Sequence, residues 1–256
     1  MINKLTFNER SLLFAKLSSI AYQDQDNAIK NARKLGFTTV EFYENKSAQA
    51  YRFQNKNDMV IACRGTQPTQ WLDIRADLRA YPVKSETVSR VHKGFKNQAD
   101  RLWPMIISDI TRTQNKNKNL WFCGHSLGAA MATIMASRCH KDQWTNQVQE
   151  LYTYGSPRVG WKDYVRSLEV THHRWVNNND IVTTVPLRTM GYKHHGNRCY
   201  INSQGKVVDY KLWNRIKDKV KGFFAGILKG KIDSFSDHSI DLYIKYLEET
   251  NAKKKA

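Results

Sequence analysis

The residues best suited to nucleophilic chemistry form a short motif in the middle of the chain. Gly124, Ser126 and Gly128 stand in a G-x-S-x-G pattern between an apolar run and an Ala-rich run. This pattern predicts a nucleophile elbow, in which a serine is held on a tight turn between a strand and a helix. Glycines suit the flanking positions because a Cβ there would keep the strand and the helix apart. Ser126 is therefore the candidate nucleophile, and an incidental Gly/Ser turn is the alternative.

A serine hydroxyl is a weak nucleophile, so it needs a base and a carboxylate that orients the base. In α/β hydrolases these residues follow the serine in the order Asp or Glu, then His. Asp180 stands in a polar loop just after an apolar run, which makes it the preferred carboxylate. Asp163 and Asp209 are weaker candidates, because they fall in an expected helix and an expected hairpin.

Three histidines follow Asp180 and could serve as the base. His238 begins the final amphipathic run, in a loop from which an imidazole can project over a sheet edge. His194 and His195 also satisfy the chain order and stay open as alternatives. The chain has no C-x-x-C or H-E-x-x-H motif, and its four widely spaced cysteines are expected to be buried thiols. We therefore expect no metal and no cofactor.

The scaffold for these residues is predicted from the pattern of apolar runs. Residues 37–44, 48–54 and 59–63 are β-rich and predict an antiparallel meander. From residue 95 onward helical runs (95–111, 127–140, 162–168) alternate with strand-like runs (120–123, 148–154, 172–176). The alternation predicts an α/β fold with a mostly parallel central sheet flanked by helices. A capping box of Thr6 and Glu9 predicts an opening helix.

Composition limits the class of protein. The 256 residues can form one core, so we expect a single domain over residues 1–256. The formal net charge of +18 favours an anionic partner, and an anionic membrane or lipid surface is the one expected. No nucleic-acid-binding motif is recognisable. The start of the chain lacks an apolar signal region, so we expect a protein that is cytoplasmic as synthesised or is exported without an ordinary signal peptide.

Six motifs, in order, connect this chain with a known family. Between about residue 21 and residue 247 they resemble the class 3 lipase family, an α/β-hydrolase group that includes fungal triacylglycerol lipases and feruloyl esterases. The motifs are Arg64-Gly65-Thr66, Val91-His92-Lys93-Gly94-Phe95, Gly124-His125-Ser126-Leu127-Gly128, Gly155-Ser156-Pro157-Arg158-Val159-Gly160, Asp180-Ile181-Val182 and Asp237-His238.

The resemblance assigns a role to each candidate catalytic residue. It implies Ser126 as the nucleophile, Asp180 as the orienting carboxylate and His238 as the general base, and it makes His194 a structural position. The family often has proline three residues after the aspartate. This chain has Thr183 there, so we expect a differently shaped loop.

The resemblance also points to the groups that would bind an oxyanion. These are Thr66, through its amide and hydroxyl, and the amide of Leu127. Free N–H groups at the start of a helix agree with the second assignment, since they and the positive end of the helix dipole converge there.

Two amphipathic segments could control access to the serine. Residues 68–79 place apolar side chains at helical spacing, and this segment resembles the lid of the family. Residues 211–231 combine an apolar stripe with a lysine-rich face, which predicts a basic amphipathic helix for anionic lipid. An ordinary surface or core-packed helix is the alternative for both. Residues 250–256 are expected to form a flexible basic tail.

The sequence thus predicts a serine carboxylic-ester hydrolase that acts on acyl lipids, triacylglycerol or phospholipid, through an acyl-enzyme on Ser126. An esterase for soluble feruloyl or short-chain acyl esters is the alternative. A basic membrane- or nucleic-acid-binding module, with incidental triad-like residues, is the remote alternative.

Overall fold

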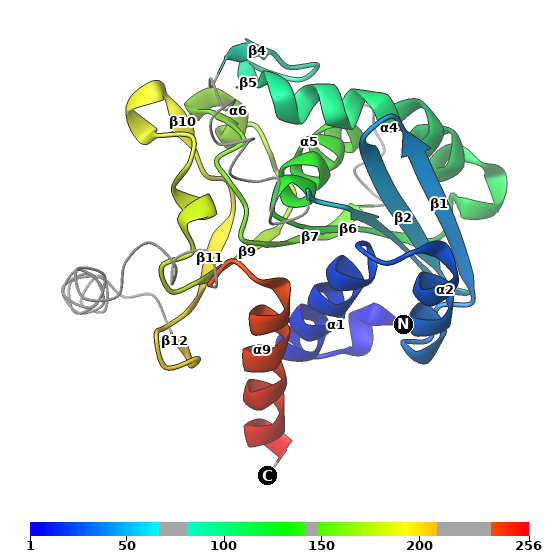
Figure 1. Ribbon diagram of the computed structural model, residues 1–256. Helices are drawn as coiled ribbons and strands as arrows, with labels where there is room; N and C mark the ends of the chain where they lie inside the picture. Colours follow the sequence, from blue (N-terminus) through cyan, green and yellow to red (C-terminus); the bar gives the residue numbers. More distant parts are fainter. Residues whose placement is uncertain (67–80, 142–147, 209–236, 256) are drawn as a thin grey trace.

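A central β-sheet organises the computed structural model, which describes residues 1–66, 81–141, 148–208 and 237–255 (Figure 1). Within these residues the sheet has eight strands in the order β1-β2-β3-β6-β7-β9-β11-β12. Their bounds are Thr39–Asn45 (β1), Ala48–Gln54 (β2), Asp58–Cys63 (β3), Asn119–His125 (β6), Val148–Tyr154 (β7), His172–Asn177 (β9), Asn197–Ile201 (β11) and Val207–Val208 (β12).

The middle of the sheet is parallel and its ends are antiparallel. From β3 through β6, β7 and β9 to β11, each strand pairs with its neighbour in parallel. β1, β2 and β3 form the antiparallel meander expected from the sequence, and β12 adds an antiparallel strand at the other end. The prediction of an α/β fold with a mostly parallel sheet is confirmed. In such a sheet the carboxyl ends of the parallel strands meet at one edge, where ligands bind.

Helices cover both faces of this sheet, as Figure 1 shows. α4 (Lys93–Thr111) and α5 (Leu127–Lys141) pack on one face. α1 (Phe7–Ile20), α2 (Gln25–Lys34) and α9 (Ile240–Lys255) pack on the other. The predicted capping box begins α1, because the Glu9 N–H donates to the Thr6 hydroxyl and the Thr6 N–H donates to the Glu9 carboxylate.

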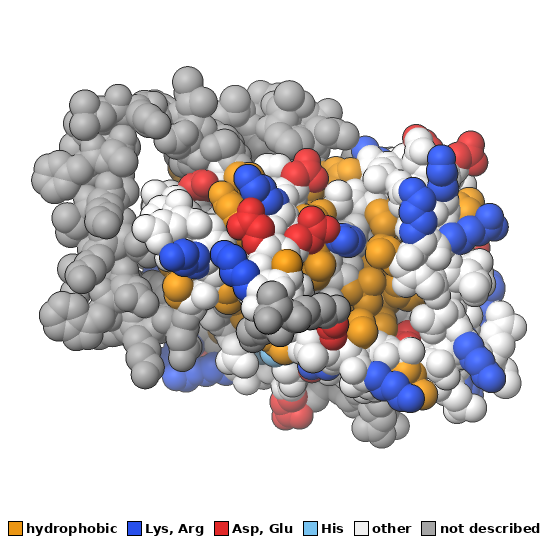
Figure 2. Space-filling model, turned by 90° about the horizontal axis from the view of Figure 1, so that it is seen from below, with side chains coloured by type: hydrophobic (Ala, Val, Ile, Leu, Met, Phe, Trp, Pro, Cys, Tyr) orange, Lys and Arg blue, Asp and Glu red, His pale blue; other side chains and the backbone are white. Residues whose placement is uncertain are grey.

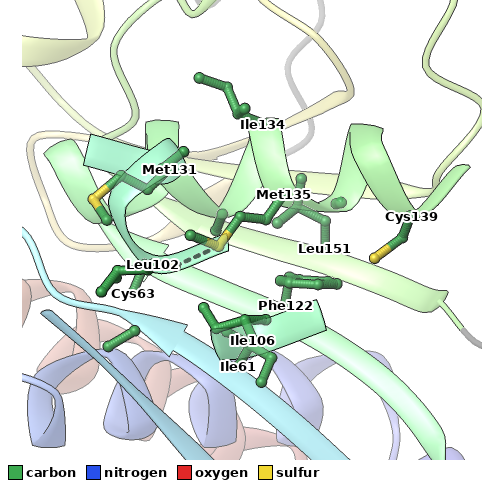
Figure 3. Close-up of a cluster of buried hydrophobic side chains, with 14 of the residues drawn as sticks. Ile61, Cys63, Leu102, Ile106, Phe122, Met131, Ile134, Met135, Cys139 and Leu151 are labelled. Atoms are coloured by element: carbon green, nitrogen blue, oxygen red, sulfur yellow. Dashed lines mark hydrogen bonds between the residues drawn. The ribbon is translucent and has the colours of Figure 1, made fainter. Parts of the chain in front are cut away.

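A cluster of buried hydrophobic side chains packs α5 and α4 against the sheet (Figure 3). Ile61 and Phe122 from the strands, Met131 and Met135 from α5, and Leu102 from α4 are all 0 to 1% exposed. Complete burial of such side chains contributes about 1.5 to 3 kcal/mol each to folding. This layer therefore fixes the position of α5, and with it the start of that helix.

A smaller sheet and several short helices complete the described structure. The small sheet has the order β10-β8-β5-β4. The bounds of these elements are Pro82–Lys84 (β4), Arg90–His92 (β5), Gly160–Trp161 (β8), Tyr192–Lys193 (β10) and Lys162–Arg166 (α6), with 3-10 helices at Ile2–Lys4 (η1), Thr113–Asn115 (η3), Ile181–Thr184 (η5) and Arg188–Met190 (η6).

Three segments singled out in the sequence have different outcomes. The expected lid at residues 68–79 and the expected basic helix at 211–231 lie outside the described residues. Residues 250–255 of the expected tail are helical, because α9 continues to Lys255. The side chain of Asn251 donates to the Asn8 carbonyl at 3.1 Å and so ties this part of α9 to α1.

Candidate active site

The candidate nucleophile lies at the turn from β6 to α5. Ser126 has a left-handed backbone (φ 62°), and its N–H donates to the Tyr154 carbonyl on β7 at 3.0 Å. A Cβ on Gly124 would lie 2.5 Å from the Gly128 carbonyl, and a Cβ on Gly128 would lie 2.1 Å from the Cys63 carbonyl in β3. The glycine spacing of the motif therefore follows from the close contact of α5 with β6 and β3.

Ser126, His238 and Asp180 form a continuous chain of hydrogen bonds. Ser126 Oγ lies 2.8 Å from His238 Nε2, and His238 Nδ1 lies 2.9 Å from each carboxylate oxygen of Asp180. A carboxylate only accepts, so Nδ1 carries the proton and Nε2 accepts from the serine hydroxyl. The three residues are between 0 and 4% exposed. Chemically, this arrangement can take a proton from the serine and stabilise the imidazolium that results.

Asp180 is fixed by its own loop and by α9. It caps η5 directly after β9, where its Oδ1 accepts from the Val182 N–H at 3.0 Å. Its Oδ2 accepts from the Tyr243 hydroxyl at 2.6 Å, and that hydroxyl accepts from the Asn177 N–H at 3.0 Å. Thr183 closes the turn by donating to the Asp180 carbonyl at 2.8 Å. Burial and the Asp180 charge raise the pKa of Tyr243 well above its usual value, so Tyr243 remains a donor.

Gly155 packs directly against the Asp180–His238 pair. Gly155 follows β7 with a φ of 57°, a region that favours glycine. A Cβ there would lie 2.6 Å from Asp180 Oδ2 and 2.7 Å from His238 Nδ1. This lack of space explains why the motif that begins at Gly155 has a glycine at its first position.

The loop that carries His238 is hydrogen-bonded to the loop after β9. Asp237 Oδ2 accepts from the Asn178 side chain at 3.0 Å and from the Asn179 N–H at 3.3 Å. The side chain of Asn177 donates to the Asp237 carbonyl at 2.9 Å. These contacts join the loop that carries the base to the loop that carries the carboxylate.

A second histidine holds His238 from the other side. His125 Nε2 donates to the His238 carbonyl at 2.7 Å, and His125 Nδ1 accepts from the Tyr22 hydroxyl at 2.9 Å. Burial, together with the nearby His238, holds the pKa of His125 well below its usual value. His125 is therefore neutral, which is the form that can donate through one nitrogen and accept through the other.

The two residues expected to bind an oxyanion flank the elbow. Leu127 is the first residue of α5, and N–H groups in the first turn of a helix have no carbonyl partner within it. Thr66 is partly buried and follows Gly65, where a Cβ would lie 2.7 Å from the His125 carbonyl and 3.3 Å from the Ser126 Cβ. The backbone that leads to Thr66 therefore runs against the elbow.

The structure separates the alternative candidates from the serine. His194 and His195 each donate through Nε2 to a backbone carbonyl, at 2.8 and 3.0 Å, outside the Ser126–His238–Asp180 chain. Asp163 lies within α6, and Asp209 lies outside the described residues. Of the three histidines that chain order allowed, the structure brings His238 to Ser126.

Sequence reasoning did not assign roles to Tyr22, Asn178 and Tyr243. Tyr243 carried a usable signal, since it lies five residues after His238 in an amphipathic run that the sequence places in a helix. Tyr22 and Asn178 carried none, because their partners are distant along the chain.

In the described part of the chain, no group of three or more His, Cys, Asp or Glu side chains could hold a metal ion, and no helix has the length and apolar character of a membrane span. The thiols of Cys63 and Cys123 are buried, and burial raises the pKa of Cys123 to about 12.

The topology and the order of Ser, Asp and His define an α/β-hydrolase fold. The same fold occurs in the lipase of Rhizopus microsporus var. chinensis (TM-score 0.65, 20% identity, covering 77% of this chain and 76% of that chain). It also occurs in the triacylglyceride lipase of Rhizomucor miehei (TM-score 0.64, 24% identity, covering 78% and 83%). The sequence model of the class 3 lipases matches residues 60–190, just over half of the chain, and the chain belongs to this family.

Curated relatives share shorter stretches of sequence. Toxin TseL of Vibrio cholerae is 40% identical over 116 residues, which cover 44% of this chain and 18% of the toxin. The lipase of Rhizomucor miehei is 30% identical over 165 residues, which cover 60% and 45%. The chain thus spans less than half of the length of either relative.

The expectation of a cytoplasmic protein is corrected by these comparisons. Relatives from Penicillium cyclopium and Fusarium solani, 34% and 30% identical over the matched residues, are named as secreted mono- and diacylglycerol lipases. The names point to an extracellular rather than a cytoplasmic location. The expectation rested on the absence of a recognisable signal peptide, which is weaker evidence than sequence similarity to relatives named as secreted.

Proposed function

We propose that this protein is a serine hydrolase that cleaves carboxylic esters of acyl lipids through an acyl-enzyme on Ser126. The observation that carries the proposal is the buried hydrogen-bonded chain Ser126–His238–Asp180, with 2.8 Å between nucleophile and base. Membership of the class 3 lipases supports an ester substrate, and the names of relatives that act on glycerides support an acyl lipid.

The reaction begins when Ser126 Oγ attacks the ester carbonyl and His238 Nε2 accepts the serine proton. The tetrahedral intermediate collapses, the alcohol leaves with the proton held by His238, and the acyl group stays on Ser126. Water then attacks the acyl-enzyme with His238 as base, and the free acid departs. Asp180 keeps the imidazole in the required tautomer and stabilises its charged form throughout.

We propose that the oxyanion of each intermediate is bound by the amide of Leu127 and by the amide and hydroxyl of Thr66. The position of Leu127 at the start of α5 supports this, because the helix N-terminus favours a negative charge. Loss of one such donor costs about 3 to 4 kcal/mol of transition-state stabilisation.

Contact with an anionic lipid surface is proposed as the partner interaction. A net charge of +18 supports it, since anionic phospholipid attracts basic proteins by about 1 kcal/mol per Lys or Arg near the surface.

Replacement of Ser126 by alanine tests the chemistry. Ser126→Ala removes the attacking oxygen, so ester hydrolysis should fall by a factor on the order of 10⁴ or more, while circular dichroism and melting temperature stay close to those of the parent. The substrates are emulsified triacylglycerol, phospholipid and a short soluble ester, each with and without anionic vesicles. Substantial turnover by a folded Ser126→Ala protein would contradict the nucleophile. Faster cleavage of the soluble ester than of any lipid would contradict the substrate class.

A further inference from the structure

A basic cavity lies beside the loop that carries Asp180. Its volume is about 810 Å³, and its walls come from β9, β11, α6 and the loop after β9. Sixteen described residues line it; seven of these are Lys or Arg, and Asp180 is the single acidic residue among them. We call this cavity the basic pocket. On the face seen in Figure 2, by contrast, Lys and Arg side chains are interspersed with Asp and Glu.

Arg174 on β9 lines the basic pocket and is 6% exposed. Its Nε has no hydrogen-bond partner, and no carboxylate among the described residues forms an ion pair with it. The other two buried arginines in the described part of the chain are paired. Arg52 bonds to Asp109, and Arg138 bonds to Glu86 and Asp100. Arg174 thus differs from them in having no ion-pair partner among the described residues.

The environment of Arg174 disfavours its charge. Burial, followed by repulsion from Arg198 and Arg158, lowers the pKa of Arg174 to about 9. At neutral pH the guanidinium is still protonated, so Arg174 is a buried positive charge with no ion-pair partner in the described part of the chain. Such a charge is costly unless an anion joins it.

We propose that the basic pocket binds the phosphate group of an organic phosphate. Guanidinium groups match phosphate because their N–H groups bond two of its oxygens at once, and the ammonium groups of Lys162 and Lys193 add charge at the same pocket. The volume is that of a typical small-molecule site and exceeds a bare phosphate ion, which leaves room for the group that the phosphate is attached to.

The location of the pocket relates it to the candidate active site. The Asp180 loop forms a wall of the basic pocket and also carries the carboxylate that bonds His238. A phosphate held there lies next to the hydrolytic machinery. If the phosphate belongs to a lipid headgroup, the substrate class becomes a phospholipid, a reading that rests on the proposed function. Binding itself does not depend on hydrolysis.

Thermal melting at constant ionic strength tests the site with inorganic phosphate and glycerol phosphate as probes. Both should raise the melting temperature of the parent relative to chloride, since a ligand that binds only the folded state stabilises it. Arg174→Met should melt above the parent without phosphate, because it removes an unpaired buried charge, and should lose more than half of the phosphate-dependent rise. Arg33→Met, at an exposed position on α2, should behave like the parent.

The same melts separate binding from catalysis. Ser126→Ala should keep the full phosphate response, so an error in the proposed hydrolysis leaves this result unchanged. An equal phosphate response in Arg174→Met and the parent would overturn the site. A lower melting temperature of Arg174→Met without phosphate would also overturn it, because Arg174 would then be a structural residue.

Vesicle sedimentation identifies the source of the phosphate. Phosphatidic acid vesicles should bind the parent several-fold more tightly than they bind Arg174→Met, with Arg33→Met as the control for loss of one charge, if the pocket receives a lipid headgroup. Equal vesicle binding by all three, with the melting response intact, assigns the pocket to a soluble organic phosphate. A parent that responds to neither soluble phosphate nor phosphatidic acid vesicles refutes the pocket as a phosphate site.

Discussion

At the scale of single residues, Ser126 shows how the proposed chemistry depends on an uncommon backbone conformation. Its φ of 62° lies in the left-handed region, which costs a non-glycine residue on the order of 1 to 3 kcal/mol. The hydrogen bond from its N–H to Tyr154 and the packing of α5 against β6 offset that cost. The conformation places Oγ towards His238 and the following amide, that of Leu127, at the start of the helix.

Tyr243 is the residue whose contribution to the triad can be isolated with the smallest change. Tyr243→Phe removes the hydroxyl that donates to Asp180 at 2.6 Å but keeps the buried ring. A hydrogen bond to a charged group contributes about 1.5 to 3 kcal/mol. We expect kcat for ester hydrolysis to fall by about tenfold to about a hundredfold, with KM little changed, because the ring orientation and charge of His238 are less well supported.

Tyr51→Phe is the matched control for that measurement. The Tyr51 hydroxyl donates to the Gln23 carbonyl at 3.0 Å, away from the triad, so its loss should alter stability but not kcat. If Tyr243→Phe and Tyr51→Phe have the same kcat as the parent, Tyr243 supports the fold alone.

At the scale of elements, the active-site geometry depends on how closely α5 crosses β6 and β3. A Cβ at Gly128 would lie 2.1 Å from the Cys63 carbonyl. The carbonyl belongs to the backbone and the position of a Cβ is fixed by its backbone, so neither can move by a simple change of rotamer. The crossing is anchored by the apolar layer in Figure 3, in which the Cys63 thiol lies 3.7 Å from the Met135 sulfur.

Gly128→Ala should therefore damage both stability and activity. Overpacking of this kind costs about 1 to 3 kcal/mol or more, and a shift of α5 moves the amide of Leu127 together with Ser126. We expect a lower urea midpoint and a kcat reduced by at least about tenfold.

Gly36→Ala provides the comparison. Gly36 has a φ of 85°, but a Cβ there would meet nothing within 4 Å, so the change should cost about 1 to 2 kcal/mol through backbone strain alone. Its kcat per folded molecule should equal that of the parent. If Gly128→Ala loses no more activity than Gly36→Ala, the close crossing does not control the site.

Element prediction succeeded where apolar periodicity was long and regular. The strand predicted at 148–154 is found at Val148–Tyr154, and the helix predicted at 127–140 is found at Leu127–Lys141. The small sheet of β4, β5, β8 and β10 was not predicted, because strands of two or three residues leave no periodic pattern.

At the scale of the whole molecule, the histidines set the response to acid. Burial is the leading cause that lowers the pKa of five of them, and for His92 the pKa falls to about 4. The five are His92, His125, His172, His194 and His195. In the folded protein the neutral form of each is favoured relative to an unfolded chain, which protonates histidine near its ordinary pKa of about 6.5.

Stability should therefore be retained above about pH 6.5 and lost as the pH falls below it. In that range the unfolded chain binds more protons than the folded protein, so each such histidine lowers the free energy of unfolding by up to about 1.4 kcal/mol per pH unit. Urea unfolding at several values between about pH 7 and about pH 5 measures this slope. Most carboxyl groups titrate below that range, so they contribute little to it.

His92→Phe isolates one of these contributions. Both ring nitrogens of His92 are buried without a hydrogen-bond partner, and its ring lies 4.1 Å from that of Phe95, so an aromatic side chain fits the site. The variant should lose less stability than the parent over the same pH range. An unchanged slope in His92→Phe would show that His92 titrates normally in the folded protein.

The sequence by itself determined the α/β class, the meander, the position of the elbow and the chain order of Ser126, Asp180 and a later histidine, because these follow from local periodicity and from motifs with fixed spacing. Only the tertiary structure decided between His238 and the pair His194 and His195, since hydrogen bonds across more than a hundred residues depend on where the strands and α9 meet. The roles of Tyr243 and Gly155, and the grouping of basic side chains around Arg174, likewise arise from packing between elements distant in the chain, which single-sequence patterns do not encode.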